Sequence, residues 1–425
     1  MWEYVFWGAG AAAVTTLVAV VIFANITPGE KTIEHRIERL YGADSPDFRR
    51  VLSVLLGPDL TEGNHVRLLR NGDEIFPAML EAIRSARQSI CFETFIYWSG
   101  EIGREFAQAL SERARAGVPV QVLLDWLGSQ RIDKDVLSRM RDAGVQVELY
   151  HRPRLMQLRR FNNRTHRKLL VVDGRIGFTG GVGVADHWRG HAQDEAHWRD
   201  SHFRAEGPVV AQFQAVFLDN WIKATGTVLH GERYFPPLSA AGPLPAQMFS
   251  SSPSGGSASM HLMYLLAIVA ASRSIQLQSA YFVPDRLAVQ ALIDAARRGV
   301  AVQVLVPGRR TDAEVVRRAS RALWGRLLAA GIEIAEYQPT MFHCKVLVVD
   351  ELLVSVGSTN FDNRSFRLND EANLNVIDAG FAREMVETFR QDWQRARPVT
   401  LHAWKHRPLW QRLPERAAAL LRQQL

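Results

Sequence analysis

The sequence predicts an α/β protein of two similar lobes, each a mostly parallel sheet flanked by helices, preceded by one transmembrane helix. Three observations support this prediction. Strand-like runs alternate with helix-like stretches, the same succession of segments occurs twice, and the first thirty residues contain a long uncharged apolar stretch. With 425 residues, 47% of them hydrophobic, the chain is long enough for two ordinary domains or one duplicated domain.

The apolar stretch comes first along the chain. No charged residue occurs from Tyr4 to Gly29, which is enough to cross a hydrocarbon layer of about 30 Å. Trp2, Tyr4 and Trp7 cluster at one end, where interfacial aromatic residues belong. A buried core helix and a cleaved signal peptide are the alternatives, and the missing basic n-region argues against the second. Residues 1–30 are therefore predicted to be a transmembrane helix.

The charge around this stretch predicts its orientation. No Lys or Arg precedes it, and the basic residues that follow it closely are Lys31, Arg36, Arg39, Arg49 and Arg50. The bulk of the protein is therefore expected in the cytoplasm. The two cysteines, Cys91 and Cys344, lie far apart in apolar runs and are expected to be buried free thiols in a reducing compartment.

The rest of the chain divides into five predicted parts. Residues 31–60 form a polar helical connector, and the two lobes occupy residues 61–235 and 257–400. The Pro-, Gly- and Ser-rich stretch 236–256 is predicted to link them. Residues 401–425 form a basic amphipathic tail that lies either on an anionic membrane surface or packed against the lobes.

The repeat is visible in equivalent segments. A strand-like run begins after the similar sequences Ser85–Ile90 and Ala270–Ile275, and each half continues through helix-like and strand-like segments. The first half alone carries a basic insertion between Tyr150 and its histidine motif, with the arginines Arg152, Arg154, Arg159 and Arg160. This insertion is predicted to be a flap that contacts anionic headgroups and acyl chains, with a solvated basic loop as the alternative.

The strongest signal is a motif, His-x-Lys-x4-Asp, that occurs once in each half. Its residues are His166, Lys168 and Asp173, and His343, Lys345 and Asp350. His and Lys stand two apart on a predicted strand, so their side chains share a face. A glycine-rich turn follows each copy, and the residues predicted to approach a phosphate there are Gly180, Gly181, Gly357, Ser358 and Asn360.

This set of residues suits phosphodiester chemistry. The reaction needs a nucleophile, an acid for the leaving alkoxide and positive charge for the phosphate oxygens, and two histidines with two lysines supply all three without a cofactor. No metal site is predicted, because the lysines would repel a cation and no cluster has ligand spacing. The net charge of +7 predicts an anionic partner, and the apolar N-terminal stretch favours lipid over nucleic acid.

The motifs resemble those of the phospholipase D superfamily, and the wider pattern resembles its bacterial cardiolipin synthases. The segments that carry the likeness are THRKLLVVDGRIGFTGG, WRDSHFRAEGPVV, SAYFVPD and GSTNFDNRSFRLNDEANL. The resemblance assigns nucleophilic attack to His166 and protonation of the leaving group to His343. It also implies that a carboxylate downstream of each motif, Asp200 or Glu371, orients a histidine.

Asp173 and Asp350 are then mainly supports of the motif loops. One position departs from the family pattern: Gly183 stands where the motif commonly has asparagine, opposite Asn360. The phosphate is therefore expected to be held less symmetrically, with Asn360 the more important donor.

The resemblance implies transfer of a phosphatidyl group through a phosphohistidine, with phosphatidylglycerol as donor and acceptor, cardiolipin and glycerol as products, and no nucleic acid as partner. Hydrolysis to phosphatidic acid and a nuclease activity are the alternatives. The expected location is the bacterial inner membrane, with a single span and cytoplasmic lobes. The oligomeric state stays open.

Overall fold

The computed structural model describes Trp7 and residues 15–16, 33–152, 163–252 and 259–425. The predicted transmembrane helix lies almost wholly outside these residues, as does the part of the predicted flap that carries Arg154, Arg159 and Arg160. Within the described ranges, no helix combines the length and hydropathy that a membrane span requires.

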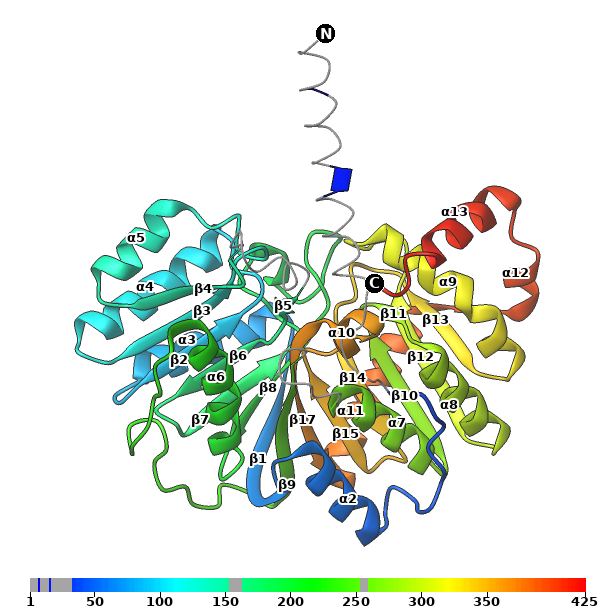
Figure 1. Ribbon diagram of the computed structural model, residues 1–425, viewed down its shortest axis with the longest axis horizontal. Coiled ribbons are helices and arrows are strands. Elements are labelled where there is room, and N and C mark those ends of the chain that lie inside the picture. Colours follow the sequence, from blue (N-terminus) through cyan, green and yellow to red (C-terminus); the bar gives the residue numbers. More distant parts are fainter. Residues whose placement is uncertain (1–6, 8–14, 17–32, 153–162, 253–258) are drawn as a thin grey trace.

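One mixed sheet of 16 strands runs through both halves of the chain (Figure 1). The strands of the first half are β1 (Thr61–Arg70), β2 (Ile90–Thr94), β3 (Val120–Asp125), β4 (Gln146–Tyr150), β5 (Arg164–Thr165), β6 (Leu169–Val172), β7 (Ile176–Gly180) and β8 (Ser201–Glu206). Those of the second half are β9 (Leu244–Ser251), β10 (Ser274–Ser279), β11 (Phe282–Val283), β12 (Ala301–Pro307), β13 (Glu333–Tyr337), β14 (Lys345–Val349), β15 (Leu353–Gly357), β16 (Phe361–Asp362), β17 (Asn369–Ile377) and β18 (Ala396–Val399). Strands β11 and β16 form a separate pair.

The strand order confirms the duplication. From the centre of the sheet outward, one side has β1, β8, β7, β6, β2, β3 and β4, and the other has β9, β17, β15, β14, β10, β12 and β13. Each strand of one side has its equivalent at the same position on the other. The two lobes meet at the antiparallel pair of β1 with β9, so they share one sheet.

The prediction of a mostly parallel sheet was wrong. In the large sheet, the parallel neighbours within the halves are β2–β3–β4 and β10–β12–β13, while β6, β7 and β8 and their equivalents β14, β15 and β17 run antiparallel. The physical reason is the connection: β6 joins β7, and β14 joins β15, through a short turn, whereas parallel neighbours need a longer crossover.

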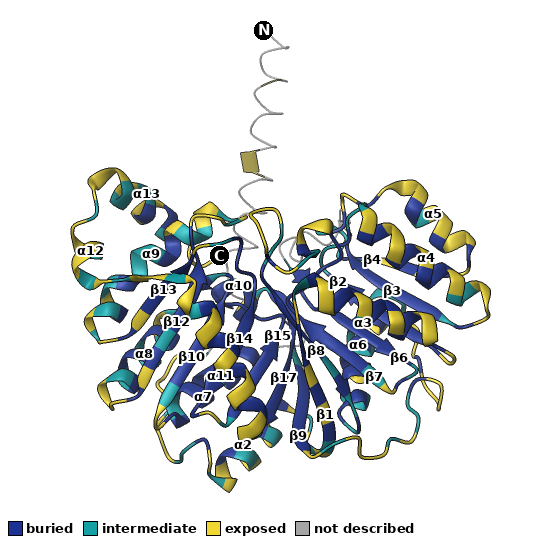
Figure 2. Ribbon diagram, turned by 180° about the vertical axis from the view of Figure 1, so that it is seen from behind, coloured by how far each residue is buried: buried dark blue, intermediate teal, exposed yellow. Residues whose placement is uncertain are grey.

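Helices cover both faces of the sheet. They are α2 (Pro46–Leu56), α3 (Asn71–Ser85), α4 (Glu101–Arg115), α5 (Lys134–Asp142), α6 (Val210–Thr225), α7 (Ser259–Ala270), α8 (Arg286–Arg297), α9 (Glu314–Ala329), α10 (Asn363–Arg367), α11 (Ala379–Gln394), α12 (Leu401–Lys405) and α13 (Leu409–Ala419), with a short 3-10 turn at Asp186–Trp188. Figure 2 shows buried strands beneath helices whose outer faces are exposed. The motif strands β6 and β14 are therefore buried along their length, and Lys345 is the one polar residue in them.

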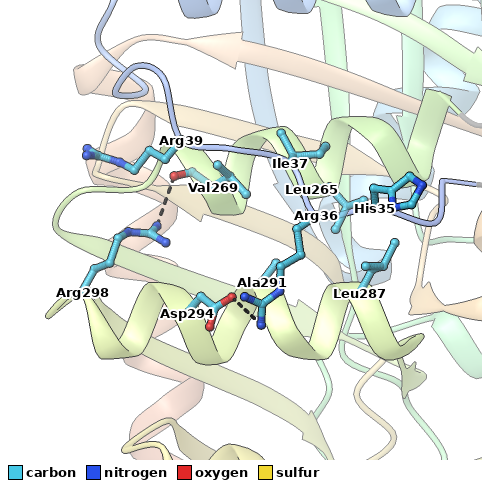
Figure 3. Close-up of a pocket in the computed structure, with 10 residues that line it drawn as sticks. All are labelled: His35, Arg36, Ile37, Arg39, Leu265, Val269, Leu287, Ala291, Asp294 and Arg298. Carbon is cyan, nitrogen blue, oxygen red and sulfur yellow. Dashed lines mark hydrogen bonds and ion pairs between the residues drawn. The ribbon is translucent and has the colours of Figure 1, made fainter.

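The predicted connector is helical only in part, because α2 covers Pro46–Leu56 and residues 33–44 contain no helix. The non-helical segment instead packs Ile33, Ile37 and Tyr41 against the core of the second half. Figure 3 shows Arg36 of this segment paired with Asp294 of α8, with 3.4 Å between Nη2 and Oδ2. This contact attaches the segment to α8.

The segment 236–256, predicted to be a linker, contains β9, which the structure buries between β1 and β17. Proline, glycine and serine at its ends obscured the strand between them. Leu244, Ala246 and Met248 of β9 join the core that spans both halves. The junction of the lobes is therefore part of the continuous sheet.

The tail helices α12 and α13 pack against α9. The indole Nε1 of Trp404 donates to the Arg321 carbonyl oxygen at 2.7 Å, and Glu415 is paired with Arg321 and Arg407. Of the two placements expected for the tail, the structure has the one packed on the second half.

Candidate active site

Each motif histidine is held by the backbone of the other half. The His166 N–H donates to the Asp370 carbonyl at 2.9 Å, where β5 of the first half pairs with β17 of the second. The His343 N–H donates to the Arg199 carbonyl at 2.8 Å, beside a bridge between Arg199 and Phe342. The two motifs therefore meet in one site at the junction of the lobes.

The histidine–carboxylate pairs are also crossed between halves. His166 Nδ1 lies 2.9 Å from Glu371 Oε1, and His343 Nδ1 lies 2.8 Å from Asp200 Oδ2. Asp200 belongs to the first half and Glu371 to the second, so each histidine contacts the carboxylate of the other half. Crossed pairing follows from the backbone bonds above, which insert each histidine beside the other half's strand.

The two lysines lie within the same site. Strands β6 and β14 begin at Leu169 and Lys345, so the histidines occupy the extended segments just before them rather than the strands themselves. Lys345 Nζ donates to the His343 carbonyl at 2.6 Å and lies 3.2 Å from both ring nitrogens of His343. Lys168 Nζ donates to the His166 carbonyl at 2.7 Å. Both ammonium groups are buried.

Burial sets the charges of the first pair. It raises the pKa of Glu371 to about 7, opposed by Lys168 and by a hydrogen bond from Ser358 Oγ at 2.5 Å. It also lowers the pKa of His166 well below its usual value, with Lys168 and Lys345 adding to the effect. His166 is therefore a neutral imidazole beside a carboxylate that titrates near neutrality.

The second pair differs. Burial alone would raise the pKa of Asp200, but His343 and Lys345 hold it below its ordinary value. Asp200 Oδ2 accepts from Trp188 Nε1 at 2.9 Å, and Oδ1 accepts from the Ser201 N–H at 2.8 Å. Burial and Lys345 lower the pKa of His343, which Asp200 opposes. Asp200 is a fixed anion in this site.

The two lysines of the site also have lowered pKa values. Burial, followed by repulsion from Lys345, lowers the pKa of Lys168 to about 7, and burial lowers that of Lys345. Two cations that repel each other in a buried site favour an anion between them. This arrangement can bind a phosphate group.

Asp173 and Asp350 stand apart from the histidines, at the turns that follow β6 and β14. The Asp173 carboxylate accepts three backbone N–H groups from residues 87–89, and Asp350 does the same with residues 272–274. Both residues have a positive φ, 54° and 55°. They support the loops before β2 and β10, which explains why the sequences there are repeated.

The residues of the glycine-rich turns bond mainly to neighbouring strands. The Gly181 N–H donates to Ser201 O at 3.1 Å, and the Ser358 N–H donates to Ala372 O at 3.0 Å. A Cβ on Gly181 would lie 2.1 Å from Asp200, so glycine there permits the close approach of that carboxylate. Gly180 and Gly357 likewise lie against β8 and β17. The amides of Gly181 and Ser358 are thus satisfied within the fold.

Asn360 and Gly183 occupy different environments. Asn360 is buried, and its Oδ1 has no hydrogen-bond partner among the described atoms. A Cβ on Gly183 would lie 2.9 Å from Ile96 Cβ and 3.3 Å from the Trp188 ring. Glycine at this position is therefore required by packing, and the space that an asparagine would occupy is already filled.

Several other residues complete the site and were not predicted from the sequence. Rings surround the histidines: Phe95 lies 5.4 Å from His166, and Trp188, Trp198 and Tyr281 lie 5.4, 5.6 and 6.4 Å from His343 between ring centroids. Arg199 forms a buried two-point ion pair with Asp392 of α11, at 2.9 Å for each contact. Trp198 and Arg199 lie in the WRD segment and Tyr281 in the SAYFVPD segment, so the family-like segments were the available signal.

Three other predictions concern groups outside this centre. Arg152, the described arginine of the predicted flap, is exposed. Cys91 and Cys344 are buried free thiols, as expected, and burial raises their pKa values to about 12. Within the described part of the chain, no group of three or more His, Cys, Asp or Glu side chains is placed to hold a metal ion.

Two equivalent halves that share one buried histidine–lysine site define a phospholipase D-like protein. A family model described as "Cardiolipin synthase, PLD-like domain" matches residues 79–221 and 264–393. The chain belongs to this family.

Curated relatives agree with this assignment. The chain is 35% identical over 405 residues to the "Major cardiolipin synthase ClsA" of Bacillus subtilis, covering 92% of this chain and 84% of that protein. It is 38% identical over 365 residues to "Cardiolipin synthase A" of Pseudomonas fluorescens (strain SBW25), covering 84% and 74%.

Two solved structures share the fold. A phosphatidylserine synthase of Haemophilus influenzae superposes with a TM-score of 0.69 at 14% identity, over 89% of this chain and all of that one. A polyphosphate kinase of Porphyromonas gingivalis gives a TM-score of 0.53 at 13% identity, over 88% of this chain and 53% of that one.

Proposed function

We propose that this protein is a cardiolipin synthase that transfers a phosphatidyl group from one phosphatidylglycerol to the hydroxyl of another and releases glycerol. The single observation that carries the proposal is the pair of crossed histidine–carboxylate contacts, with two buried lysines, in a chain that belongs to the cardiolipin synthase family. It requires no metal or cofactor, since the four basic side chains supply all the functions that the reaction needs.

The first step is attack of His166 Nε2 on phosphorus while Nδ1–H donates to Glu371. The bond from phosphorus to the glycerol oxygen breaks, and His343 gives its proton to that oxygen. The products of this step are a phosphatidyl group on His166 and free glycerol. A bound phosphodiester anion raises the pKa of both histidines, which keeps the proton on His343 before transfer.

The second step reverses the proton movement. The hydroxyl of a second phosphatidylglycerol gives its proton to His343 as its oxygen attacks phosphorus, and the bond to His166 Nε2 breaks. Cardiolipin leaves and the site returns to its starting charges. Lys168, Lys345 and Asn360 bind the non-bridging oxygens in both steps.

The difference between the pairs supports this division of roles. A neutral imidazole can attack phosphorus, and the pKa of His166 is held well below its usual value. A general acid needs its cationic form stabilised, and His343 contacts Asp200, the carboxylate whose pKa is lowered. His166 is therefore the nucleophile and His343 the acid and base.

The proposal includes the bacterial inner membrane as location, with residues 1–30 as a single span and the lobes in the cytoplasm. Support comes from the uncharged N-terminal stretch and the net charge of +7. The arginines near residues 152–160 are proposed to contact anionic headgroups. A reporter fused at the C-terminus should be active in the cytoplasm, and cleavage of the lobes by protease added from the periplasmic side would contradict this topology.

Hydrolysis is the competing activity, since water can replace the second lipid and release phosphatidic acid. The decisive experiment incubates purified protein with isotopically labelled phosphatidylglycerol and identifies the lipids by mass spectrometry. Cardiolipin and glycerol in equal amounts are expected. Phosphatidic acid as the main product would assign the protein as a hydrolase instead.

A further inference from the structure

A groove separate from the active site lies where the tail packs on the second half. It is bordered by α9, the end of β18, α12 and α13, the elements at the upper right of Figure 1. Its volume is about 880 Å³, within the usual range for small-molecule sites. None of the motif residues lines it.

The groove carries a surplus of positive charge. Its lining includes six arginines and three glutamates: Arg309, Arg317, Arg318, Arg321, Arg397 and Arg407 with Glu314, Glu336 and Glu415. Six positive and three negative charges leave a net charge of +3. A site with this surplus is complementary to an anion.

Two buried carboxylates hold the arginines in place. Glu336 accepts from Arg317 Nη2 at 2.6 Å and from Arg321 Nη1 at 3.1 Å, and Glu415 accepts from Arg321 Nε at 2.9 Å and Arg407 Nε at 2.6 Å. Burial opposes ionisation of Glu336, but these arginines hold its pKa below the ordinary value. The guanidinium groups are therefore positioned before any ligand binds, which reduces the entropy lost on binding.

Donors remain available after these pairs are made. Among the described residues, no carboxylate forms an ion pair with Arg309, which is exposed at the groove. Arg317 Nε is buried and lacks a hydrogen-bond partner in the described structure. Arg397 is also exposed. In a variant that lacks the Arg397 side chain, Glu336 keeps its ion pairs with Arg317 and Arg321. An anion in the groove can contact the exposed guanidinium groups of Arg309 and Arg397.

An exposed apolar surface borders the groove along α13 and the residues after it. Its members, each between 52% and 85% exposed, are Leu409, Trp410, Leu413, Leu420 and Leu421. Trp410 belongs to both the groove and this surface. Large apolar side chains gathered on one exposed helix are unusual in a soluble protein and typical of contact with lipid.

We propose that this groove binds the phosphodiester headgroup of an anionic phospholipid, whose acyl chains lie along the exposed apolar surface of α13. Arginine recognises phosphate oxygens through two-point hydrogen bonds, and the adjoining apolar surface selects a lipid over free phosphate. This site is additional to the catalytic one and does not depend on the reaction proposed above.

A short series of contacts links the loop at the edge of the groove to the active site. Arg309 precedes Asp312 in the same loop, Asp312 accepts a hydrogen bond from Tyr281 Oη at 2.7 Å, and the Tyr281 ring lies 6.4 Å from His343. A lipid held in the groove would therefore attach the second half to the bilayer beside a loop that contacts an active-site ring.

The test uses the full chain in detergent, with His166→Ala to prevent turnover, titrated with dihexanoyl phosphatidylglycerol and followed by native mass spectrometry. Two binding steps are expected. In Arg309→Gln/Arg397→Gln one step should weaken roughly tenfold, as expected from the loss of two partly exposed charge contacts, while the other is unchanged. The matched control, Arg297→Gln/Arg383→Gln, removes two exposed arginines elsewhere and should leave both steps unchanged.

Probes without acyl chains identify the ligand class. Glycerophosphoglycerol and inorganic phosphate should bind the groove more weakly than the short-chain lipid, and Leu409→Ser/Leu413→Ser should abolish that preference. Equal binding of inorganic phosphate would overturn the assignment to a lipid. A single binding step, or two steps that the groove variant leaves unchanged, would overturn the site itself. Because binding is measured without turnover, failure of the proposed reaction would not affect either result.

Discussion

The two histidine–carboxylate pairs occupy equivalent positions in the duplicated fold, yet their charges differ. Glu371 beside His166 has a pKa raised to about 7, whereas Asp200 beside His343 has a pKa below its usual value. Duplication therefore supplies the geometry twice, and the neighbours of each pair determine how it is charged. The comparison teaches that symmetric placement of residues does not give them equal chemistry.

The neighbours that differ are few. The Ser358 hydroxyl donates to Glu371 in the second half, and its equivalent in the first half is Gly181, which has no side-chain hydroxyl to donate. Asp200 instead receives the indole N–H of Trp188. Trp188 also fills the space beside Gly183, so one residue both supports the anion and accounts for the glycine in place of asparagine.

The largest expected effect distinguishes the catalytic roles of the two histidines. His166→Ala removes the nucleophile and should lower the rate by at least about four orders of magnitude, while His343→Ala should cost about 10²- to 10⁴-fold. A phosphodiester with a p-nitrophenolate leaving group needs no protonation, so it should restore much of the His343→Ala rate and none of the His166→Ala rate. Restoration of His166→Ala instead would reverse the assignment.

The next effect tests the crossed pairing. Asp200→Asn removes the anion beside His343 and should lower the rate by about a hundredfold or more. In double-mutant cycles, Asp200→Asn and His343→Ala should be strongly non-additive, because the two residues act as a unit. Asp200→Asn combined with His166→Ala should be closer to additive. Strong coupling within the halves rather than across them would contradict the structure in solution.

A smaller effect concerns pH. The rate should rise as pH passes through about 7, because ionised Glu371 best accepts the Nδ1 proton of His166. The hydrogen bond from Ser358 lowers the pKa of Glu371, so Ser358→Ala should raise this pKa and move the limb to higher pH. The variant should be severalfold slower at pH 6 and close to the parent at pH 9. If Ser358→Ala leaves the rise in the pH–rate profile at the same pH, Glu371 is not the group whose ionisation causes that rise.

The smallest effect is on stability. Gly183→Ala places a methyl group 2.9 Å from Ile96 Cβ, and such overpacking should lower the free energy of unfolding by about 1–3 kcal/mol. Chemical denaturation measures the change. Ile96→Gly removes the Cβ atom that the added methyl group would meet, so the double variant should be less destabilised than the sum of the single variants predicts. Simple additivity would show that Ile96 is not the obstacle.

Much of the fold followed from the sequence, because repeated segments and buried apolar strands are local signals. The duplication and the meeting of both motifs follow from such signals. The antiparallel direction of β7 and β8 does not follow from local signals. It depends on whether a short turn or a long crossover joins the strands, and these connections differ in length more than in composition. Strand β9 was mistaken for a linker because proline, glycine and serine flank it and its own apolar alternation is brief.

The site shows a similar limit. The repeated motif predicted histidine and lysine together, and the family resemblance added the carboxylates, which the structure places within hydrogen-bond distance of the histidines. Which carboxylate meets which histidine depends on contacts between segments far apart in the chain, such as β5 with β17, and no local pattern encodes them. The pKa differences depend on burial and neighbouring charges, which exist only in the folded protein.

The crossed arrangement also determines when activity can begin during synthesis. His166 leaves the ribosome 205 residues before its partner Glu371. At about 5–20 residues per second, the nucleophile waits roughly 10–40 s for the strand that orients it. A partly made chain therefore contains a complete first motif without a competent site. The enzyme is kept inactive until its second half has been made and folded.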